Sequence, residues 1–441
     1  MIVGRLQRMI SAKIHSKIAV EAELKKQKIV GQLSSTFDDI IRAEKEDYES
    51  ESVRRPLNVV GLFAGIGGVE LGLQKAGHHC ELLCEIDAAA KAVLNARFPE
   101  VRVHDDVITL LTLPSKIDMI TGGFPCQDLS QAGKGAGILN GSRSSLVSEV
   151  FRLIRTHNVP YVLIENVSFM LKLDSGRAMN VLASAFEELG YKWAYRVVNS
   201  LAFGVPQRRE RVIFLASSNE DPRTILFADE VEEPQTEIDV VGKVPCGFYW
   251  TEGIRGLGWA VNAVPTLKGG STIGIPSPPA IIFPTGFVGT PDIRDAERMQ
   301  GFPADWTEPA CGVAKASTRW KLVGNAVTVD LFTWLGQRLR RPNLCGTRVT
   351  GWPMKKTGGW PRAGWNIGSG RFGSAISSYP VLNDRPDLTV WLKYSPKPLS
   401  LKATSGFLER TERSSLRFPP DFIEVLRTHK KRMESATKSN I

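Results

Sequence analysis

A cysteine on a short loop is the residue of this sequence best placed for chemistry. Cys126 lies in the stretch Gly-Gly-Phe-Pro-Cys-Gln at 122–127, directly after residues 116–121, whose apolar side chains predict a short buried strand. Pro125 restricts the backbone just before the sulfur. Ligands bind at the carboxyl ends of strands in an open α/β sheet. A lone cysteine is more often a small buried hydrophobic residue, but the glycines, proline and glutamine favour a loop and therefore a functional thiol.

Three charged residues are predicted at the same edge of that sheet. Glu165 follows the apolar run 161–164, and a carboxylate at the carboxyl end of a strand is a candidate acid. Arg209 and Arg211 alternate at the start of a further strand, which predicts that they share one face. Two guanidiniums there would hold an anionic or carbonyl-rich ligand. The alternative is a surface salt-bridge ladder with Glu210.

A glycine-rich loop opens the first predicted strand-and-helix unit. Residues 63–68, Phe-Ala-Gly-Ile-Gly-Gly, follow the predicted strand 57–62 and precede a helical run. Glycines let the backbone approach a ligand closely, and the amino end of the helix supplies hydrogen-bond donors. The pattern is not GxGxxG, because Glu70 interrupts it, and no phosphate-loop lysine follows. A pyrophosphate ligand, and with it a dinucleotide oxidoreductase, is disfavoured.

Acidic residues end the next two predicted strands. The strand 80–84 ends at Glu85, which is placed to accept hydrogen bonds from ribose hydroxyls. Asp87 is suited to capping the helix that follows, which is the structural alternative for this acidic cluster. The strand 101–104 ends at Asp106, which would bind an adenine amino group or else be an ordinary solvated loop acid.

The composition is that of a globular protein. Hydrophobic residues make up 42% of the 441 residues, and the mean hydropathy is -0.11. No apolar run approaches the length of a membrane span, and the amino terminus lacks a signal-peptide core, so we expect an intracellular, cytoplasmic protein with no membrane partner. The six cysteines form no CxxC pair and no zinc-type spacing with histidine, so neither a disulfide framework nor a metal site is predicted.

The positive charge is concentrated near the carboxyl end. The chain carries a net charge of +10, whereas residues 338–441 alone carry 20 Lys and Arg against 7 Asp and Glu, leaving about -3 for the rest. Such a basic segment commonly meets nucleic acid, although a merely solvated tail is a strong alternative.

Changes in composition divide the chain into five parts. Strand and helix patterns alternate over 53–217 and return over 316–340, which predicts an α/β domain. Between them, residues 218–315 are rich in Pro, Gly, Thr and Ser and predict a smaller, loop-rich domain with short strands. Residues 1–52 predict a helical extension, and residues 341–441 form the basic carboxyl-terminal extension.

Taken together, the motifs resemble the DNA 5-cytosine methyltransferase family of bacterial type. The resemblance runs from Leu57 to about Leu335. The matching segments occur in the family's order: 63–68, 123–127, 165–167, 207–211, 298–303 and 324–327. Departures are Gly61, where the family often has aspartate, Thr328 after the last motif, and Asp128-Leu129 after the cysteine motif. None of them removes a reacting group, so they bear on details of cofactor fit.

The resemblance implies a covalent mechanism. Carbon 5 of cytosine is a poor nucleophile, so a thiolate, here that of Cys126, adds to carbon 6 first. By resemblance, Glu165 contacts ring nitrogen 3 and the exocyclic amine, while Arg209 and Arg211 hold the base carbonyl. The cytosine must be flipped out of the duplex, and the Gly/Ser-rich segment 131–145 is the element expected to close over it.

The resemblance also implies a fold and a cofactor. The fold is a Rossmann-like S-adenosylmethionine-dependent domain with a smaller target-recognition domain, which is the loop-rich region 218–315. No metal is implied. Seven residues would contact S-adenosylmethionine: Phe63, Gly65 and Gly67 around the methionine portion, Glu85 on the ribose, Ile86 against adenine, Asp106 on its amino group, and Asn325 closing the site.

The expected partner is duplex DNA, together with a cognate restriction endonuclease, and the expected state is a monomer. Candidate DNA contacts in the recognition domain are Arg255, Thr266 and Lys268, and the basic carboxyl-terminal segment would add phosphate contacts. Two alternatives remain open from the sequence: an RNA-acting enzyme of the same family, and a catalytically idle DNA-binding regulator.

Overall fold

The computed structural model describes residues 53–124, 146–235, 241–270, 276–355 and 358–438. The chain divides into two compact units, 1–54 and 55–441, and the elements below belong to the second. The predicted helices of 1–52, the closing segment 131–145 and Cys126 itself lie outside the described residues.

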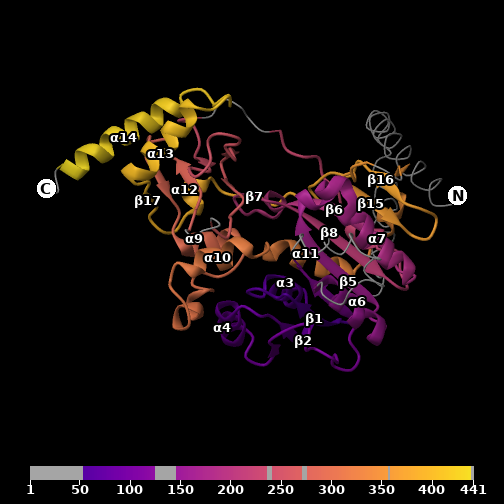
Figure 1. Cartoon of the computed structure of the whole chain (residues 1–441). Helices are drawn as coiled ribbons and strands as arrows, with labels where there is room; N and C mark the ends of the chain where they lie inside the picture. Colours follow the sequence, from indigo (N-terminus) through magenta and orange to yellow (C-terminus); the bar gives the residue numbers. More distant parts are fainter. Residues whose placement is uncertain (1–52, 125–145, 236–240, 271–275, 356–357, 439–441) are drawn as a thin grey trace, which may run out of the picture. The chain divides into compact units, whose positions relative to one another are not determined.

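A ten-stranded mixed sheet is the framework of the described chain (Figure 1). Its strand order is β14-β16-β15-β6-β8-β5-β4-β1-β2-β3, and the run from β5 to β3 is parallel while the others pair antiparallel. The strands are β1 (Asn58–Leu62), β2 (His79–Cys84), β3 (Arg102–His104), β4 (Met119–Gly122), β5 (Tyr161–Val167), β6 (Lys192–Asn199), β8 (Glu210–Ser217), β14 (Trp352–Pro353), β15 (Ala363–Asn366) and β16 (Phe372–Ser374). The predicted α/β fold class is confirmed.

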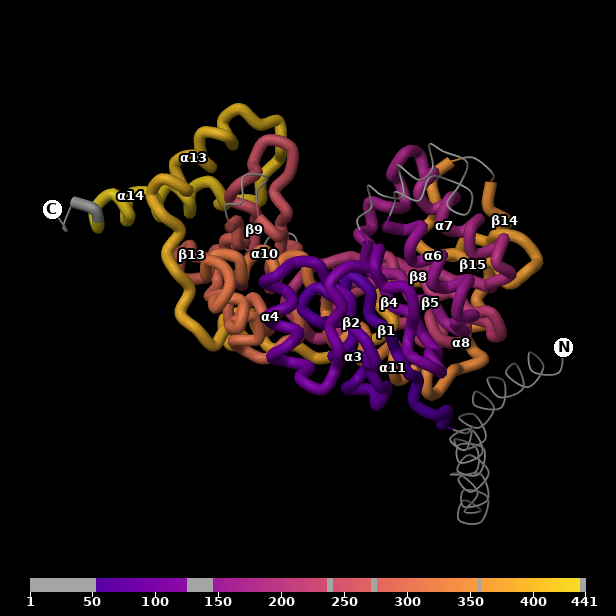
Figure 2. The backbone as a smooth tube through the Cα atoms, turned by 60° about the horizontal axis from the view of Figure 1, so that its bottom comes forward, coloured from indigo at the N-terminus to yellow at the C-terminus, as the bar shows by residue number. Residues whose placement is uncertain are grey.

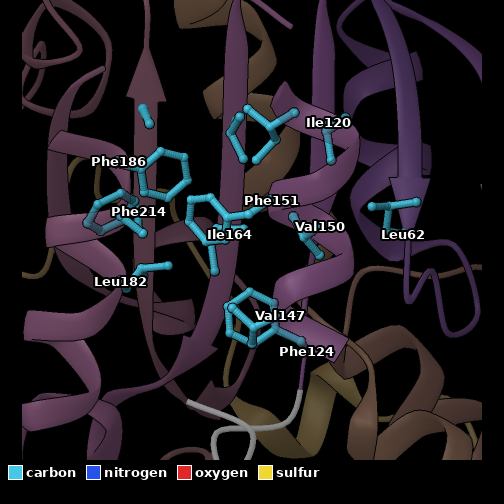
Figure 3. Packing of buried hydrophobic residues seen from close by; sticks show 14 of the residues in the cluster. Leu62, Ile120, Phe124, Val147, Val150, Phe151, Ile164, Leu182, Phe186 and Phe214 are labelled. Carbon is cyan, nitrogen blue, oxygen red and sulfur yellow. The ribbon is translucent and has the colours of Figure 1, made fainter. Parts of the chain in front are cut away.

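Helices cover both faces of this sheet, because its central strands are apolar on both sides. One face packs against α6 (Leu146–His157) and α7 (Arg177–Glu188), and the other against α3 (Gly68–Lys75), α8 (Arg223–Leu226) and α11 (Val329–Arg340). In Figure 3, Val147, Val150 and Phe151 of α6 lie over Ile164 and Ile120 of the strands. Helix α4 (Ala88–Arg97) packs in a separate cluster with Phe302 and Trp306.

The chain adds parallel strands on both sides of β1: β2 and β3 lie on one side, and β4 and β5 lie on the other. β1 pairs with β2 on one side and with β4 on the other, as Figure 2 shows. β1 leads into α3 on one face of the sheet and β4 leads toward α6 on the other, and open α/β sheets bind ligands at the carboxyl edge beside such a switch point. The glycine-rich loop follows β1, and the Cys126 loop follows β4.

A second sheet forms in the loop-rich region. Its order is β10-β9-β12-β13-β17. The strands are β9 (Cys246–Phe248), β10 (Ala260–Val261), β12 (Ala280–Ile282), β13 (Val288–Thr290) and β17 (Lys397–Pro398). Phe248 packs against Phe407 of α13 (Leu401–Glu412) and Phe422 of α14 (Phe422–Lys438), so an aromatic cluster attaches these helices to the sheet.

Short elements connect the loop-rich region 218–315 with the chain that leads into the main sheet. β7 (Gln207–Arg208) pairs in parallel with β11 (Val264–Pro265). After the second sheet, the chain returns through α9 (Ile293–Met299) and α10 (Thr318–Asn325) to α11.

Residues 341–441, which the composition separates as a basic extension, contribute strands to both sheets. β15 pairs with β6 and, with β16 and β14, continues the main sheet, while β17 pairs with β13. This segment has three Gly-Trp pairs, at 351–352, 359–360 and 364–365. Trp360 and Trp365 are buried in the two main clusters, whereas Trp352 is exposed. The short helix α12 (Leu388–Trp391) lies between the two sets of strands in sequence. Within the described residues, none of the helices is both long and apolar enough to cross a bilayer.

Candidate active site

The described chain reaches the edge of the predicted site and ends there at Phe124, two residues before Cys126. Gly122, the last residue of β4, pairs with Leu62, the last residue of β1, and with Ile164 of β5, which continues to Val167. Phe124 is buried in the core below this edge (Figure 3) and makes an edge-to-face contact with Phe63, with ring centroids 6.5 Å apart. The glycine-rich loop 63–68 and the beginning of the Cys126 loop are therefore in direct contact.

Asn166 holds the backbone that leads to the cysteine. Its Nδ2 donates to the carbonyl of Phe124 at 3.0 Å, and its Oδ1 accepts from the amide of Val167 at 2.9 Å. The Asn166 side chain is buried, so water does not readily replace it as the donor to this carbonyl. This bond joins the end of β5 to the loop after the neighbouring strand β4, so it depends on the sheet order.

Glu165 and Arg211 form an ion pair at the same edge. Arg211 Nε lies 2.8 Å from Glu165 Oε1. The Arg211 side chain is only 12% exposed and the Glu165 side chain only 13%. The pair forms because β5 and β8 are antiparallel neighbours, which brings their ends together. Among the described residues, no donor makes a hydrogen bond to Oε1, so this oxygen keeps capacity to accept one. A Cβ added to Gly123 would lie 3.5 Å from Oε2, so the carboxylate also adjoins the Cys126 loop.

Arg209 lies elsewhere, although it is only two residues from Arg211. Its guanidinium is fully buried and donates to the carbonyls of Leu267, Gly324 and Ala326. Burial lowers its pKa well below the usual value, and the nearby positive charge of Arg211 adds to this effect. The residues 207–208 belong to β7 and β8 begins at Glu210, so strand alternation does not extend across Arg209. The structure separates two arginines that the pattern placed on one face.

Gln207 makes a similar connection beside Arg209. Its Nε2 donates to the carbonyl of Met299, and its Oε1 accepts from the amide of Leu267 at 2.9 Å. Gln207 and Arg209 together tie the start of β8 to the recognition region and to the helices that follow it.

The glycine-rich loop 63–68 has an unusual backbone. Phe63, Gly65 and Gly67 all have positive φ, at 54°, 55° and 79°. A positive φ in a phenylalanine is a strained conformation, and such strain is commonly found at ligand sites. A Cβ added to Gly65 would meet no atom within 4 Å, so the space beside this residue is open.

Glu85 shapes this loop through its carboxylate. Oε2 accepts from the amide of Gly65 and Oε1 from the amide of Asp87, both at 2.8 Å. Ile86, between them, is 73% exposed, which is unusual for an isoleucine and leaves an apolar surface beside the loop. Asp87 caps α4 through the amides of Ala89 and Ala90, as the structural alternative for this cluster predicted.

The remaining predicted residues are held by local contacts. Asp106 accepts from the amide of Ile108, and Asn325 faces Gly269, where an added Cβ would lie 2.4 Å from Oδ1. In the recognition region, the hydroxyl of Thr266 donates to the carbonyl of Arg208. Lys268 pairs with Glu252 and lies over the ring of Tyr249, and Arg255 is exposed.

Residues 57–256 match the model of the C-5 cytosine-specific DNA methylase family. The chain is 45% identical over 392 residues to the type II methyltransferase M2.BsuMI of Bacillus subtilis (strain 168), and the match covers 85% of this chain and 99% of that protein. The chain belongs to the C-5 cytosine-specific DNA methylase family. It is a DNA cytosine-5 methyltransferase, as the motifs predicted.

Other members of the family match less closely. The type II methyltransferase M.PspPI of Psychrobacter sp. (strain TA137) is 29% identical over 77% of this chain and 90% of its own length. M.Eco47II of Escherichia coli is 30% identical over 63% of this chain and 78% of its own length. Among solved structures, S. pombe Dnmt2 methyltransferase is similar with a TM-score of 0.46 at 17% identity, over 64% of this chain and 98% of that one.

In this DNA cytosine-5 methyltransferase, three side chains come to the sheet edge where the Cys126 loop begins: Phe63 just after β1, Glu165 near the carboxyl end of β5, and Arg211 near the amino end of the antiparallel strand β8. Arg209 and Gln207 instead connect the recognition region to the catalytic sheet. No short-range pattern distinguishes them from Arg211, because their acceptors lie far away in the sequence.

Proposed function

We propose that this chain methylates carbon 5 of a flipped-out cytosine in a specific duplex DNA sequence through a covalent adduct with Cys126, and that it uses S-adenosylmethionine as the methyl donor. The observation that carries the proposal is the Glu165–Arg211 pair beside Gly123, at the edge where the loop of Cys126 begins. A half-buried carboxylate with spare acceptor capacity, next to a nucleophile loop, suits recognition of a cytosine edge.

The residues have distinct parts in this chemistry. The thiolate of Cys126 adds to carbon 6 of the cytosine and makes carbon 5 nucleophilic. Glu165 accepts a hydrogen bond from the exocyclic amine and, in its protonated form, donates one to nitrogen 3, which stabilises the charge that develops on the ring. Arg211 orients this carboxylate and holds the base carbonyl. After carbon 5 is methylated, its proton leaves as the bond between carbon 6 and sulfur breaks, which restores the ring and the thiolate.

The cofactor loop fits S-adenosylmethionine. The open space at Gly65 and the strained backbone at Phe63 allow a close approach of the methionine portion. The exposed Ile86 offers an apolar surface for adenine, with Glu85 beside it for the ribose and Asp106 for the amino group. When bound, this cofactor supplies an electrophilic methyl group. Asn325, at the end of α10, would close the site.

The biological setting follows from the relatives. M2.BsuMI, M.PspPI and M.Eco47II are all named as type II methyltransferases. We infer that this chain protects DNA from a cognate restriction endonuclease, acting in the cytoplasm as a monomer. The region 218–315 would read the target sequence, with Arg255, Thr266 and Lys268 as candidate contacts, and the segment 131–145 would close over the flipped base.

Transfer of tritiated methyl groups tests the proposal. The purified chain should label unmethylated duplex DNA, and bisulfite sequencing of that DNA should locate 5-methylcytosine in one recurring sequence. Cys126→Ala should abolish both labelling and the covalent complex with DNA that contains 5-fluorocytosine, while duplex binding remains. Labelling of transfer RNA alone would overturn the proposal.

A further inference from the structure

A buried carboxylate lies close to the sheet edge that the proposed function uses. Glu70, in the first turn of α3, is only 2% exposed. Its Oε1 accepts the hydroxyl proton of Thr121, in β4, at 3.0 Å. Its Oε2 has no hydrogen-bond partner among the described residues. Burial of such a group is costly, and neither the motifs nor the proposed chemistry accounts for it.

Gly61 makes room for this carboxylate. A Cβ added to Gly61 would lie 2.3 Å from Glu70 Oε1, so no other residue fits at 61 while Glu70 keeps its position. Gly61 in β1 and Thr121 in β4 are paired neighbours in the sheet, and the carboxylate therefore lies over both strands.

The three elements that meet at Glu70 lead to the two halves of the site. β1 continues into the cofactor loop at Phe63, and α3 begins where that loop ends. β4 continues through Gly123 and Phe124 toward Cys126. We propose that Glu70 is a positioning residue for methyl transfer, whose bond to Thr121 over Gly61 fixes the cofactor loop relative to the strand that leads to the nucleophile. The inference rests on the proposed function.

The ionisation of Glu70 gives this link a measurable signature. Desolvation raises the pKa of Glu70 to about 7, and the negative charge of Glu85 contributes in the same direction. Burial raises the pKa of the Cys80 thiol in β2, and the negative charge of Glu70 contributes in the same direction. Because the carboxyl group changes charge near neutral pH, the geometry of the link, and with it the rate of methyl transfer, should change with pH.

Two sets of variants test the link on the full-length protein, with single-turnover methylation of unmethylated duplex DNA as the readout. Thr121→Val and Glu70→Ala should each slow methyl transfer roughly tenfold, the order expected for a misplaced reacting group. The double variant should be no slower than either single variant, because both remove one link. Affinity for S-adenosylmethionine, measured by calorimetry, should stay near the wild-type value. Glu70→Gln keeps the hydrogen bond and should keep the rate, but it should lose the inflection near pH 7.

Moving the carboxylate from position 70 to position 61 provides the most specific test. Gly61→Asp alone should be strongly impaired, because its side chain collides with Glu70. The combination of Gly61→Asp with Glu70→Ala should recover much of the rate lost in Glu70→Ala. Glu81→Gln, an exposed carboxylate in β2, is the matched control and should behave as the wild type.

The outcomes separate this inference from the proposed function. If the wild type methylates DNA and Thr121→Val and Glu70→Ala do so at the same rate, the link has no positioning role. Additive losses, or a Glu70→Gln enzyme that keeps the inflection, would also overturn it. If Glu70→Ala does not fold, Thr121→Val carries the test. A wild type without activity on DNA would instead overturn the proposed function.

Discussion

At the scale of single residues, the backbone decides what an arginine does. Arg211 lies inside β8 and reaches Glu165 at the site, whereas Arg209 lies in the turn between β7 and β8 and points to three backbone carbonyls. The guanidinium has several donors in a fixed plane, which suits both tasks. Arg209 is therefore a structural connection between the recognition region and the catalytic sheet.

Arg209 should matter for stability. In Arg209→Lys, one ammonium cannot reach three separated carbonyls, so buried acceptors lose their donors. We expect a loss of about 2 to 4 kcal/mol in the free energy of unfolding, measured by urea denaturation. Arg208→Lys, its exposed neighbour, is the control and should cost little. Equal stability of the two variants would contradict the assigned role.

Asn166 should matter for catalysis more than for cofactor binding. Asn166→Asp keeps the acceptor for the amide of Val167 but replaces the donor to the Phe124 carbonyl with a repelling oxygen. The start of the Cys126 loop then shifts, and kcat should fall roughly tenfold or more, while the KM for S-adenosylmethionine changes little. Steady-state kinetics measures both, with the exposed Asn219→Asp as control. A change in KM alone would argue against positioning of the loop.

At the scale of elements, polar groups fasten α11 to the start of the first strand. The amide of Leu57 donates to Nδ1 of His78, and Nε2 of His78 bonds to the carbonyl of Gly336 in α11. This arrangement requires a neutral ring with its proton on Nε2. Helices α3 and α11 also pack closely, since a Cβ added to Gly72 would lie 2.5 Å from the carbonyl of Val329.

His78 should make stability fall in mild acid. Burial lowers the pKa of His78 below its usual value, because the charged ring is poorly solvated there. The unfolded chain therefore takes up a proton first, and stability is lost as the pH falls below about 6.5, by on the order of 1 kcal/mol per pH unit until the folded pKa is reached. Urea denaturation between pH 5 and 8 measures this effect.

The matched variants separate His78 from other titrating groups. His78→Gln keeps one donor and one acceptor and should flatten this part of the profile, whereas the exposed His79→Gln should not. An unchanged slope in His78→Gln would show that another group causes the loss.

At the scale of the whole molecule, the carboxyl-terminal residues complete both sheets. Arg371, in the turn before β16, binds Glu187 of α7 at 2.7 Å, and β15 covers the edge of β6. The basic charge of 341–441 is therefore spread over the main sheet and the recognition region, and it does not form one separate tail.

Truncation tests this integration. A chain ending at residue 340 exposes the edges of β6 and β13 and the aromatic surface around Phe248, so we expect it to aggregate or to lose cooperative unfolding. Circular dichroism during heating measures the transition. Residues 1–52 belong to the other compact unit, so their removal should leave the melting temperature near that of the full chain. A cooperative transition in the first truncation would contradict the role of the added strands.

The sequence by itself determined the chemistry of this protein, because that chemistry lies in short motifs. The cysteine loop, Glu165 and the glycine-rich loop each depend on neighbouring residues, and a strand followed by a loop places them at the sheet edge whatever the remaining fold. Their order along the chain carried the family resemblance.

Only the tertiary structure decided how these motifs are held. Arg209 binds carbonyls 58, 115 and 117 residues away, Glu70 reaches Thr121 across 51 residues, and β15 pairs with β6. Such contacts have no local pattern, since they depend on which strands become neighbours and which backbone groups are buried without a partner. The space at Gly61 is the clearest case, because the residue that requires it lies on a helix.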